Sequence, residues 1–154
     1  MSALHVHPVV TEADWGAARG IRERVFVQEQ RCPPDEEWDA HDWPAGRGGD
    51  CRHLLGCVNG RAVAVARWRP VLSASGRTWA KLERFAVLSE ARGAGHGRAM
   101  VEAAMSSARE AGFNRFVLYA QEHLQDFYEA WGFRSEGEVF WEAGIPHVKM
   151  TWED

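Results

Sequence analysis

Hydrophobic and polar positions near the start of the chain predict a strand followed by a helix. Residues 4–10 alternate β-branched with other side chains, which is typical of an extended segment. Thr11, followed three residues later by Asp14, has the form of a capping box and predicts the start of a helix. Apolar residues then recur at helical spacing and carry the predicted helix to about residue 28.

Residues 31–50 interrupt this periodicity and predict a long loop. Cys32-Pro33-Pro34 ends the helix, because proline lacks the N–H group that a helix interior needs. The loop is acidic, with carboxylates at Asp35, Glu36, Glu37, Asp39 and Asp42. Long loops within a compact chain are frequently functional or mobile, so this segment is a candidate for either.

Three extended runs follow and predict an antiparallel meander over 53–87. The runs 53–58 and 61–69 flank Asn59-Gly60, a strong hairpin signal, because both central residues of a type I′ turn need positive φ. Pro70 is expected to end the second run, and the run 79–87 forms the third.

Beyond residue 87 the pattern changes to that of a βαβ unit. A glycine-rich segment precedes a helix predicted over 98–111, which Gly112-Phe113 closes in the manner of a Schellman motif. The run 116–120 is apolar throughout, as in a strand buried on both faces. We therefore expect the strands 79–87 and 116–120 to be parallel, with the helix as their crossover.

The remaining residues predict one more helix and two strands. Leu124, Phe127, Tyr128 and Trp131 recur at helical spacing, which predicts a helix over 121–131. Extended runs at about 137–141 and 145–152 complete the chain.

Length and composition are those of an ordinary globular domain. The chain has 154 residues, of which 45% are hydrophobic and 26% charged. We therefore expect a single domain over 1–154, with a core that needs no disulfide or metal. The eight tryptophans and seven phenylalanines are expected mainly in that core.

Charge and cysteine spacing narrow the classes of function. The 18 basic and 22 acidic residues give a formal net charge of −4, which argues against nucleic acid as a partner. The chain has no apolar run of the ~20 residues that a membrane span needs, and no signal-peptide pattern, so we expect a cytoplasmic protein without a membrane partner. Cys32, Cys51 and Cys57 lack Cys-x-x-Cys spacing, which argues against a disulfide framework and a structural zinc site.

The segment Arg92 to Gly97 carries the clearest chemical signal. Its three glycines allow the backbone to approach a ligand, and the helix that follows presents free N–H groups, which favour a phosphate or pyrophosphate. Arg92 would add a positive charge. The alternative is a turn that needs small residues only.

Two common phosphate-binding folds do not fit this segment. A nucleoside-triphosphate P-loop has Lys-Ser/Thr after its last glycine, whereas Arg98-Ala99 follows Gly97 here. A dinucleotide-binding fold fits poorly, because the spacing is Gly-x-Gly-x-Gly and the sequence predicts only one βαβ unit.

These motifs resemble those of the GNAT N-acetyltransferase family. Arg92-Gly93-x-Gly95-x-Gly97, five residues after Val87, resembles its cofactor-binding motif, and Tyr128-x-x-x-Gly132-Phe133 is similar to a second family segment. The predicted order of elements matches the family over essentially the whole chain. Glu83-Arg84-x-Ala86-Val87 and Gly144-Ile145-Pro146-His147 further resemble an ElaA-like and YjcF-like subgroup.

The resemblance implies an α/β GNAT fold, in which a mixed, mostly antiparallel sheet contains a central parallel βαβ unit and has flanking helices. It also implies acetyl-CoA as co-substrate, without a metal or an acyl-enzyme. Amides of 92–97 would hold the pyrophosphate, and backbone of 85–87 would pair with the pantetheine arm where the parallel strands splay. The implied cofactor-binding residues are Phe85, Ala86, Val87, Arg92, Gly93, Ala94, Gly95, His96, Gly97, Arg98, Gln121 and Phe127.

Direct transfer needs a group that protonates the departing thiolate and a group that deprotonates the amine. Tyr128 lies where family members place a general acid, although its place on an apolar helix stripe is also that of a core tyrosine. Glu83 is the candidate base, or else forms a cross-strand ion pair with Arg67 or Arg69. His147 is either a base or acceptor contact, or a structural histidine.

Acidic residues near the family's acceptor site predict a cationic acceptor. Glu29, Glu37, Asp39 and Asp42 would border that site, unless they form only a solvated loop face. The predicted function is therefore acetyl transfer to a small-molecule amine or a protein lysine. The alternatives are a non-catalytic acyl-CoA-binding or sensor domain and a nucleotide-binding protein. The sequence leaves open whether the chain is a monomer or a homodimer.

Overall fold

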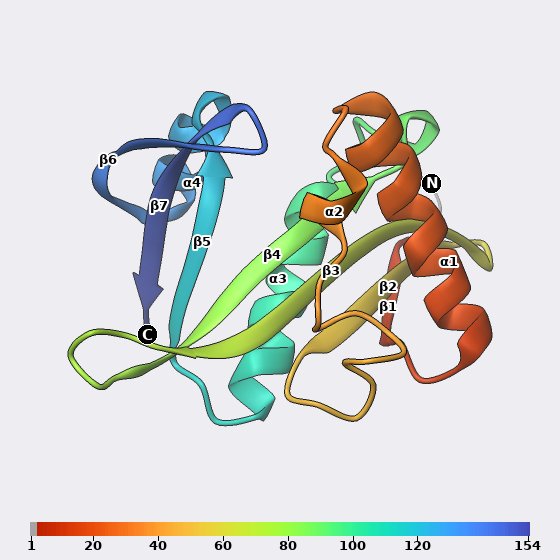
Figure 1. Cartoon of the computed structure of the whole chain (residues 1–154), viewed down its shortest axis with the longest axis horizontal. Helices are drawn as coiled ribbons and strands as arrows, with labels where there is room; N and C mark the ends of the chain where they lie inside the picture. The colour runs from red at the N-terminus through yellow and green to blue at the C-terminus, as the bar shows by residue number, and fades with distance from the viewer. Residues whose placement is uncertain (1–2) are drawn as a thin grey trace.

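A seven-stranded mixed sheet forms the centre of the molecule in the computed structural model, which describes residues 3–154 (Figure 1). The strands lie in the order β1-β2-β3-β4-β5-β7-β6, with β4 and β5 parallel and the other neighbours antiparallel. The predicted mixed sheet with a central parallel pair is confirmed. The strands are β1 (His5–Pro8), β2 (Arg52–Val58), β3 (Arg61–Leu72), β4 (Thr78–Val87), β5 (Arg115–Gln121), β6 (Arg134–Glu142) and β7 (Ile145–Glu153).

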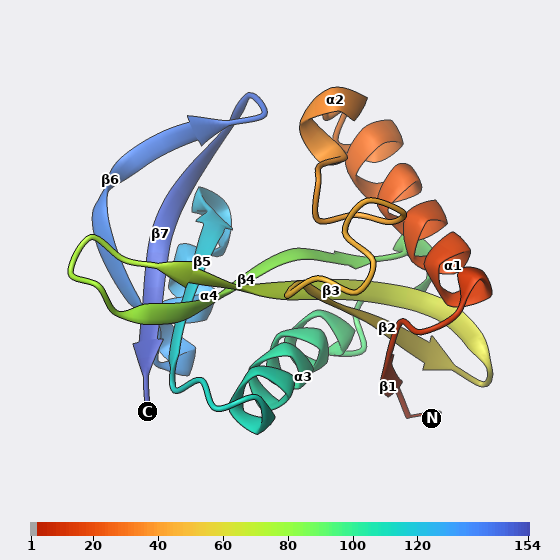
Figure 2. The ribbon, with the colours of Figure 1, turned by 60° about the horizontal axis from the view of Figure 1, so that its bottom comes forward.

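Helices cover both faces of this sheet. α1 (Glu12–Arg22) and α2 (Pro34–Glu37) lie over one face, whereas α3 (His96–Glu110) and α4 (Gln125–Trp131) lie against the opposite face (Figure 2). Shorter helical segments join them: the π-helix η1 (Glu23–Glu29) and the 3₁₀ turns η2 (Ser89–Ala91) and η3 (Glu122–Leu124).

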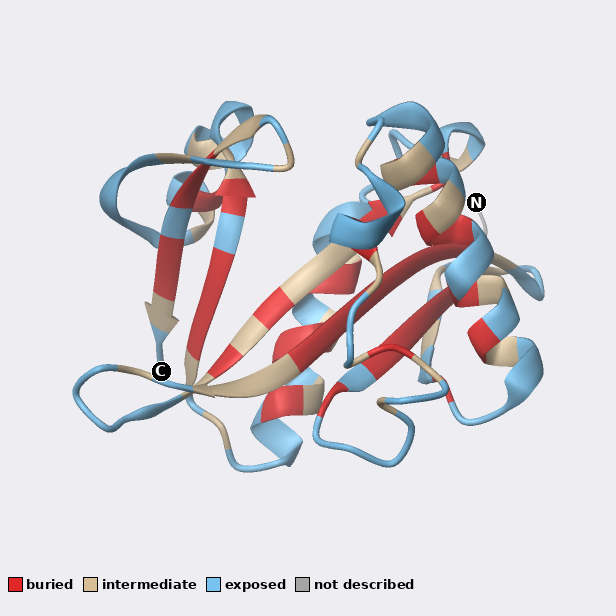
Figure 3. Cartoon of the chain, in the orientation of Figure 1, coloured by how far each residue is buried: buried red, intermediate tan, exposed pale blue. Residues whose placement is uncertain are grey.

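Each face of the sheet carries its own apolar core. The larger core lies between the sheet and the helices α3 and α4, and the smaller lies between the sheet and α1. Buried residues run along the central strands, while β6 is exposed over most of its length (Figure 3). The site therefore lies in a sheet that is packed on both faces at its centre.

The N-terminal helix begins as predicted and then changes its winding. Thr11 Oγ1 accepts a hydrogen bond from the Asp14 amide (3.0 Å), and the Asp14 carboxylate accepts one from the Thr11 amide (3.3 Å), so the capping box is confirmed. From Glu23 the helix is wider, and the Gln30 amide bonds to the Val25 carbonyl five residues back (3.0 Å). The segment predicted as one helix is thus an α-helix followed by a π-helix.

Pro70 does not end the third strand, contrary to the prediction. β3 continues to Leu72, and Pro70 pairs with Ala80 of β4. The last partner of β2 on β3 is Trp68, so beyond that residue β3 has an unpaired edge. Proline is tolerated at such an edge, because its missing N–H leaves no partner unsatisfied.

Two further boundaries differ from the prediction. The loop 31–50 contains the short helix α2, where three acidic residues follow a proline in the first turn. The helix predicted from residue 98 begins at His96, so His96 and Gly97 belong to its first turn. The last two glycine-loop residues therefore present helical N–H groups.

A β-bulge in β4 separates the two parallel strands. Val65 pairs with Ala86 and Arg67 with Glu83, so Arg84 and Phe85 together face the single residue Ala66. Arg84 takes a left-handed backbone conformation, with φ of 59°. Pairing between β4 and β5 is limited to residues 80–82 with 116–118, so the strands part just before the bulge.

We predict that replacing Gly132 by alanine destabilises the fold more than the same change at Gly137. Both glycines have positive φ (127° and 76°), but a Cβ at Gly132 would lie 2.9 Å from the Trp152 ring, whereas one at Gly137 meets no atom within 4 Å. Backbone strain costs about 1 kcal/mol, and the clash should raise the loss at Gly132 to roughly 2–4 kcal/mol. Urea unfolding measures both, and equal losses would contradict the packing argument.

Candidate active site

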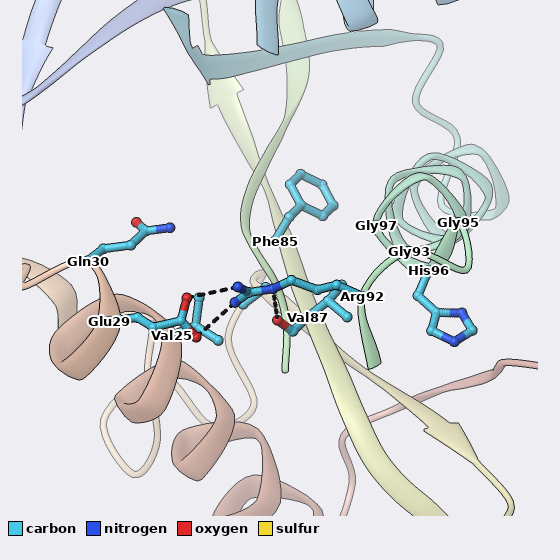
Figure 4. A pocket seen from close by; sticks show the side chains of 11 residues that line it. Val25, Glu29, Gln30, Phe85, Val87, Arg92, Gly93, Gly95, His96 and Gly97 are labelled. Carbon is cyan, nitrogen blue, oxygen red and sulfur yellow. Dashed lines mark hydrogen bonds and ion pairs between the residues drawn. The ribbon is translucent and has the colours of Figure 1, made fainter. Parts of the chain in front are cut away.

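The gap between β4 and β5 opens into a cavity of about 400 Å³ (Figure 4). One wall comes from the π-helix η1, a second from the bulged end of β4, and a third from the glycine loop before α3. The lining residues are Val25, Glu29, Gln30, Phe85, Ala86, Val87, Arg92, Gly93, Gly95, His96 and Gly97.

The glycine loop presents its backbone to this cavity. Gly93 and Gly95 have φ of 89° and 80°, and a Cβ at either would meet no atom within 4 Å. The N-cap residue of α3 is Gly95, so the helix has no side-chain cap, and its first turn has no acidic residue, in contrast to α1. Its free N–H groups and positive end therefore face open space, an arrangement that binds phosphate groups.

Arg92 crosses the cavity instead of pointing to the loop amides. Its guanidinium donates to the Val87 carbonyl (2.9 Å) and to both carboxylate oxygens of Glu29 (2.9 Å each), as Figure 4 shows. The prediction that Arg92 supplies a free positive charge for phosphate does not fit this arrangement. Glu29, predicted at the acceptor site, instead lies in the wall of this cavity.

The Val87 carbonyl points into the gap because of the strand register. The Leu88 amide donates to the Val63 carbonyl (2.9 Å), so the peptide groups of the preceding residue point away from β3. No strand pairs with this edge of β4 beyond Leu82 in the described part of the chain. The edge can therefore pair with an extended ligand.

A second cavity of about 270 Å³ adjoins the first on the side of α4. It shares Phe85, Ala86, Val87 and Gly97 with the first and adds Arg98, Met100, Leu124, Phe127 and Tyr128. Phe127 and Leu124 are 44% and 38% exposed, so the rim of this cavity presents apolar surface. Of the predicted cofactor-binding residues, all but Ala94 and Gln121 line one of these two cavities.

Those two residues lie close to the cavities. Ala94 stands between Gly93 and Gly95 in the glycine loop. The Gln121 side chain donates to the Gln30 side chain (3.2 Å) and so bridges the end of β5 to η1 across the gap. Gln30, which the sequence reasoning missed, is itself part of the cavity wall.

Tyr128 stands at the inner wall of the second cavity with a protonated hydroxyl. It is 7% exposed and packs among Phe127, Trp131 and Phe133. Burial raises the pKa of Tyr128 to about 12. No described residue forms a hydrogen bond with its hydroxyl, so this O–H group is available to a ligand.

On the opposite face of the sheet, buried arginines hold the acidic loop. Arg67, 1% exposed, donates to Glu83 (2.6 Å), Asp39 (2.6 Å) and Asp42 (3.1 Å). Arg22, 2% exposed, donates to Glu37 (2.7 Å) and Asp42 (2.6 Å). The sequence reasoning missed Arg22, and nothing in its helical position distinguishes it from a surface arginine.

Arg84 extends this network to the bulge. Its side chain contacts the Glu37 carboxylate (3.1 Å), donates to the Glu37 carbonyl (3.0 Å) and lies 3.5 Å from Asp39. Burial alone would raise the pKa of Asp39, but Arg67 and Arg84 hold it well below its usual range. Glu37 and Asp39, predicted as a free negative field for the acceptor, are therefore neutralised by arginine.

Glu83 has the surroundings of a structural anion. Burial alone would raise its pKa, but Arg67, Arg69 and Lys81 outweigh it and lower the pKa to about 2. A carboxylate with this pKa does not take up a proton near neutral pH. The cross-strand ion pair with Arg67 and Arg69 fits this geometry, and the arrangement weighs against the predicted role as base.

His147 lies on β7 directly opposite Gln121 of β5. It is 9% exposed, its Nδ1 is 2.7 Å from the Ile145 carbonyl, and its ring stacks on Phe140. His147 therefore lies beside the end of β5, on the face of the sheet opposite Val148 and Met150, and it lines neither cavity.

The three thiols are not activated. Burial raises the pKa of Cys51 to about 12, and burial also raises the pKa of Cys32 and Cys57. A nucleophilic cysteine needs a lowered pKa, because the thiolate is the reactive form. Residues 3–154 contain no group of three histidine, cysteine or carboxylate side chains placed to hold a metal.

Comparison with known proteins identifies the family. Residues 58–154 match the domain described as "Acetyltransferase (GNAT) domain". The chain belongs to the GNAT acetyltransferase family. The resemblance noted in the sequence is thereby confirmed. Separately, no helix within residues 3–154 is long and apolar enough to cross a membrane.

Individual relatives agree with this assignment. Protein ElaA of Escherichia coli is 36% identical over 152 residues, which cover 97% of this chain and 94% of ElaA. The Bacillus subtilis protein named "Uncharacterized N-acetyltransferase YjcF" is 36% identical over 132 residues, covering 84% of this chain and 86% of YjcF. A Brucella melitensis GNAT acetyltransferase solved in complex with acetyl-CoA shares the fold, with a TM-score of 0.74 at 18% identity over 99% of this chain and 89% of that one.

We predict that Glu83→Gln destabilises the protein by about 3 kcal/mol at neutral pH. The pKa of Glu83 is about 2 when folded against an ordinary 4.5, so its stabilisation is complete above about pH 4.5 and is lost as pH falls toward 2. The difference from wild type in urea unfolding should shrink over that range.

The matched control is Glu90→Gln. The pKa of Glu90 is also lowered to about 2, by hydrogen bonds from Arg24 and Arg61, but this cluster is solvent-exposed and screened by salt. Its loss should be far smaller. Equal losses for the two variants would show that burial does not set the strength of the Glu83 pairs.

Proposed function

We propose that this GNAT-family protein transfers the acetyl group of acetyl-CoA directly to an amine. The observation that carries the proposal is the gap between β4 and β5. The uncapped glycine loop borders the gap on one side, and the unpaired hydroxyl of Tyr128 lies on the other. A phosphate-bearing thioester laid along this gap would place its acyl end near the site where a proton is available.

The fit of acetyl-CoA rests on three features of the chain. Free amides at 93–97 suit the pyrophosphate, and the unpaired edge of β4 at 85–87 suits the amides of the pantetheine arm. The Val87 carbonyl already accepts from Arg92 and retains its second lone pair for a ligand N–H. The apolar rim at Leu124 and Phe127 suits the methylene groups of the arm.

Tyr128 acts as the general acid in this proposal. The amine nitrogen forms a bond to the thioester carbonyl carbon, the C–S bond breaks, and the thiolate takes the phenolic proton. The acylated nitrogen then releases a proton to solvent, and solvent restores the proton on Tyr128. Burial opposes a free thiolate as it opposes a phenolate, so a thiolate that leaves into an apolar cavity takes up a proton more readily than one in water.

Direct transfer is favoured over an acyl-enzyme because no thiol is activated. The pKa of each of the three cysteines is raised, so each remains a protonated, weakly nucleophilic thiol near neutral pH. The acceptor is an amine on a small molecule or a protein lysine, and it arrives as an ammonium ion that must lose a proton. Its attraction cannot come from Glu37 and Asp39, which are paired with arginine.

The test is thiol release from acetyl-CoA across a panel of primary amines. Amine-dependent release that needs the folded protein supports the enzyme. Stabilisation by acetyl-CoA without release from any amine would instead support an acyl-CoA-binding domain.

We predict that Gly95→Val abolishes the rise in Tm that acetyl-CoA produces in the wild type. A branched side chain at this loop position would occupy the space that the pyrophosphate needs. Gly76→Val is the matched control, since Gly76 has the same positive φ (82° against 80°) and the same open surroundings but lies in the β3–β4 turn. Both variants lose intrinsic stability; a retained acetyl-CoA shift in Gly95→Val would remove the loop from the site.

We predict that Tyr128→Phe lowers kcat by about 10²-fold and leaves acetyl-CoA affinity unchanged, the usual effect of losing one proton-transfer group. Trp131→Phe controls for packing, because Trp131 stacks on Tyr128 but does not line the cavity. That control should lower Tm while retaining kcat. Steady-state thiol release measures both, and normal turnover in Tyr128→Phe would assign the residue to the core.

A further inference from the structure

We infer that His147 is the general base of this reaction, acting through Nε2 of a neutral imidazole whose proton is fixed on Nδ1. The inference rests on the proposed acetyl transfer and adds the group that deprotonates the amine.

One hydrogen bond fixes the form of the ring. His147 Nδ1 lies 2.7 Å from the Ile145 carbonyl oxygen, which can only accept, so Nδ1 carries the proton. No described residue bonds to Nε2, and no carboxylate lies within 4 Å of the ring nitrogens in residues 3–154. Nε2 therefore keeps an unshared lone pair, which is what a base needs.

Strand register and one hydrogen bond place His147 close to the cofactor cavity, although it lines neither cavity itself. Gln30 lines the cavity and accepts a hydrogen bond from Gln121 (3.2 Å), and Gln121 is the direct cross-strand partner of His147. Side chains of such partners lie about 5 Å apart at Cβ. His147 thus stands one neighbour behind the end of β5, beyond the point where β4 and β5 part.

The strand pattern places His147 and Tyr128 on opposite faces of the sheet. Val148 and Met150 point into the core that contains Tyr128. Because successive side chains of a strand point to opposite faces, His147, which directly precedes Val148, points to the face that carries α1. The amine would enter from that face and give its proton to Nε2. The thiolate would leave toward the other face and take its proton from Tyr128.

Aromatic neighbours hold the imidazole ring in place, and no described carboxylate forms an ion pair with it. Phe140 stacks on the imidazole (5.9 Å between centroids, 25°), and Tyr119 packs edge-on against Phe140. Two charged groups on the neighbouring strands have partners: Lys149 pairs with Glu136 (3.6 Å), and Lys81 lies over the Tyr119 ring (4.2 Å). Glu142 of β6 forms no ion pair with the ring within 4 Å among the described residues.

His147 suits the task better than Glu83. Imidazole exchanges a proton readily near neutral pH, whereas the pKa of Glu83 is about 2 and three cations hold its carboxylate. The balanced step is the following. An ammonium proton moves to Nε2, and solvent then removes it from His147. The free amine attacks the thioester carbon, the C–S bond breaks, and Tyr128 protonates the thiolate. The acylated nitrogen gives up its second proton, which restores the one on Tyr128 through solvent, so the net reaction releases one proton.

The first test needs no substrate. Long-range ¹H–¹⁵N NMR of the protein labelled at histidine should show His147 with the proton on Nδ1 in its neutral form, its signals assigned by their loss in His147→Asn. A proton on Nε2 would overturn the inference, whatever the protein's activity.

The second test uses activity to distinguish a catalytic role of His147 from a structural one. Asparagine at 147 can still donate to the Ile145 carbonyl but offers no base, so His147→Asn should retain its fold and its Tm rise with acetyl-CoA. We expect kcat for thiol release, with the best amine of the panel, to fall about 10²-fold. The ionisation that reports the base in the wild-type kcat profile should disappear in this variant.

Lys149→Met is the control, because it removes a charge from the same face of β7 without touching the ring; it should keep the wild-type kcat and profile. Wild-type kcat and pH profile in His147→Asn would overturn the inference and leave the proposed function standing. Absence of amine-dependent release by the wild type would overturn both.

Discussion

Between Glu83 and Ala86, strand β4 carries one residue more than its partner on β3, and the geometry of the site follows from this bulge. Before it, Ala80 and Leu82 face the core under α3; after it, Ala86 faces the core under α1. The bulge therefore reverses which residues of β4 face each side of the sheet, at the point where β4 parts from β5. Its peptide groups at Val87 are exposed to the gap, where a strand neighbour would otherwise cover them.

Buried ion pairs hold the bulge in place. Arg84 has a left-handed backbone and contacts Glu37, which in turn binds Arg22 of α1. Arg67 binds Glu83 immediately before the bulge and binds Asp39 and Asp42 of the loop. Removing one partner of such a pair leaves an uncompensated buried charge, so the network fixes one arrangement of loop, helix and strand. The acidic loop is thus a structural element that covers the sheet, and its buried carboxylates form ion pairs with arginines.

The two faces of the sheet provide different environments at the same gap. Toward α3 and α4 the surroundings are apolar, and Tyr128 has no charged neighbour to lower its pKa. Toward α1 the gap is bordered by the Glu29–Arg92 ion pair, and His147 lies beyond the arginine network, on β7. A reaction that must give a proton on one side and take one on the other can use this division, because burial keeps the Tyr128 hydroxyl protonated while no described side chain bonds to Nε2 of His147.

Local sequence signals determined much of this architecture. The capping box at Thr11, the Asn59-Gly60 turn and the glycines before α3 act through backbone conformation over a few residues, so they could be interpreted without a structure. The same holds for the parallel pair and for the candidate cofactor loop. The tertiary structure alone decided which charges meet. Arg92 binds Glu29 63 positions away, and Arg67 binds Asp39 28 positions away, and no local pattern encodes such pairs. For the same reason Glu83, a carboxylate that could have been a base, is a buried counter-ion, because its protonation state depends on cations that only folding brings together. The unbonded Nε2 of His147 likewise follows from the contact that the fold gives to Nδ1.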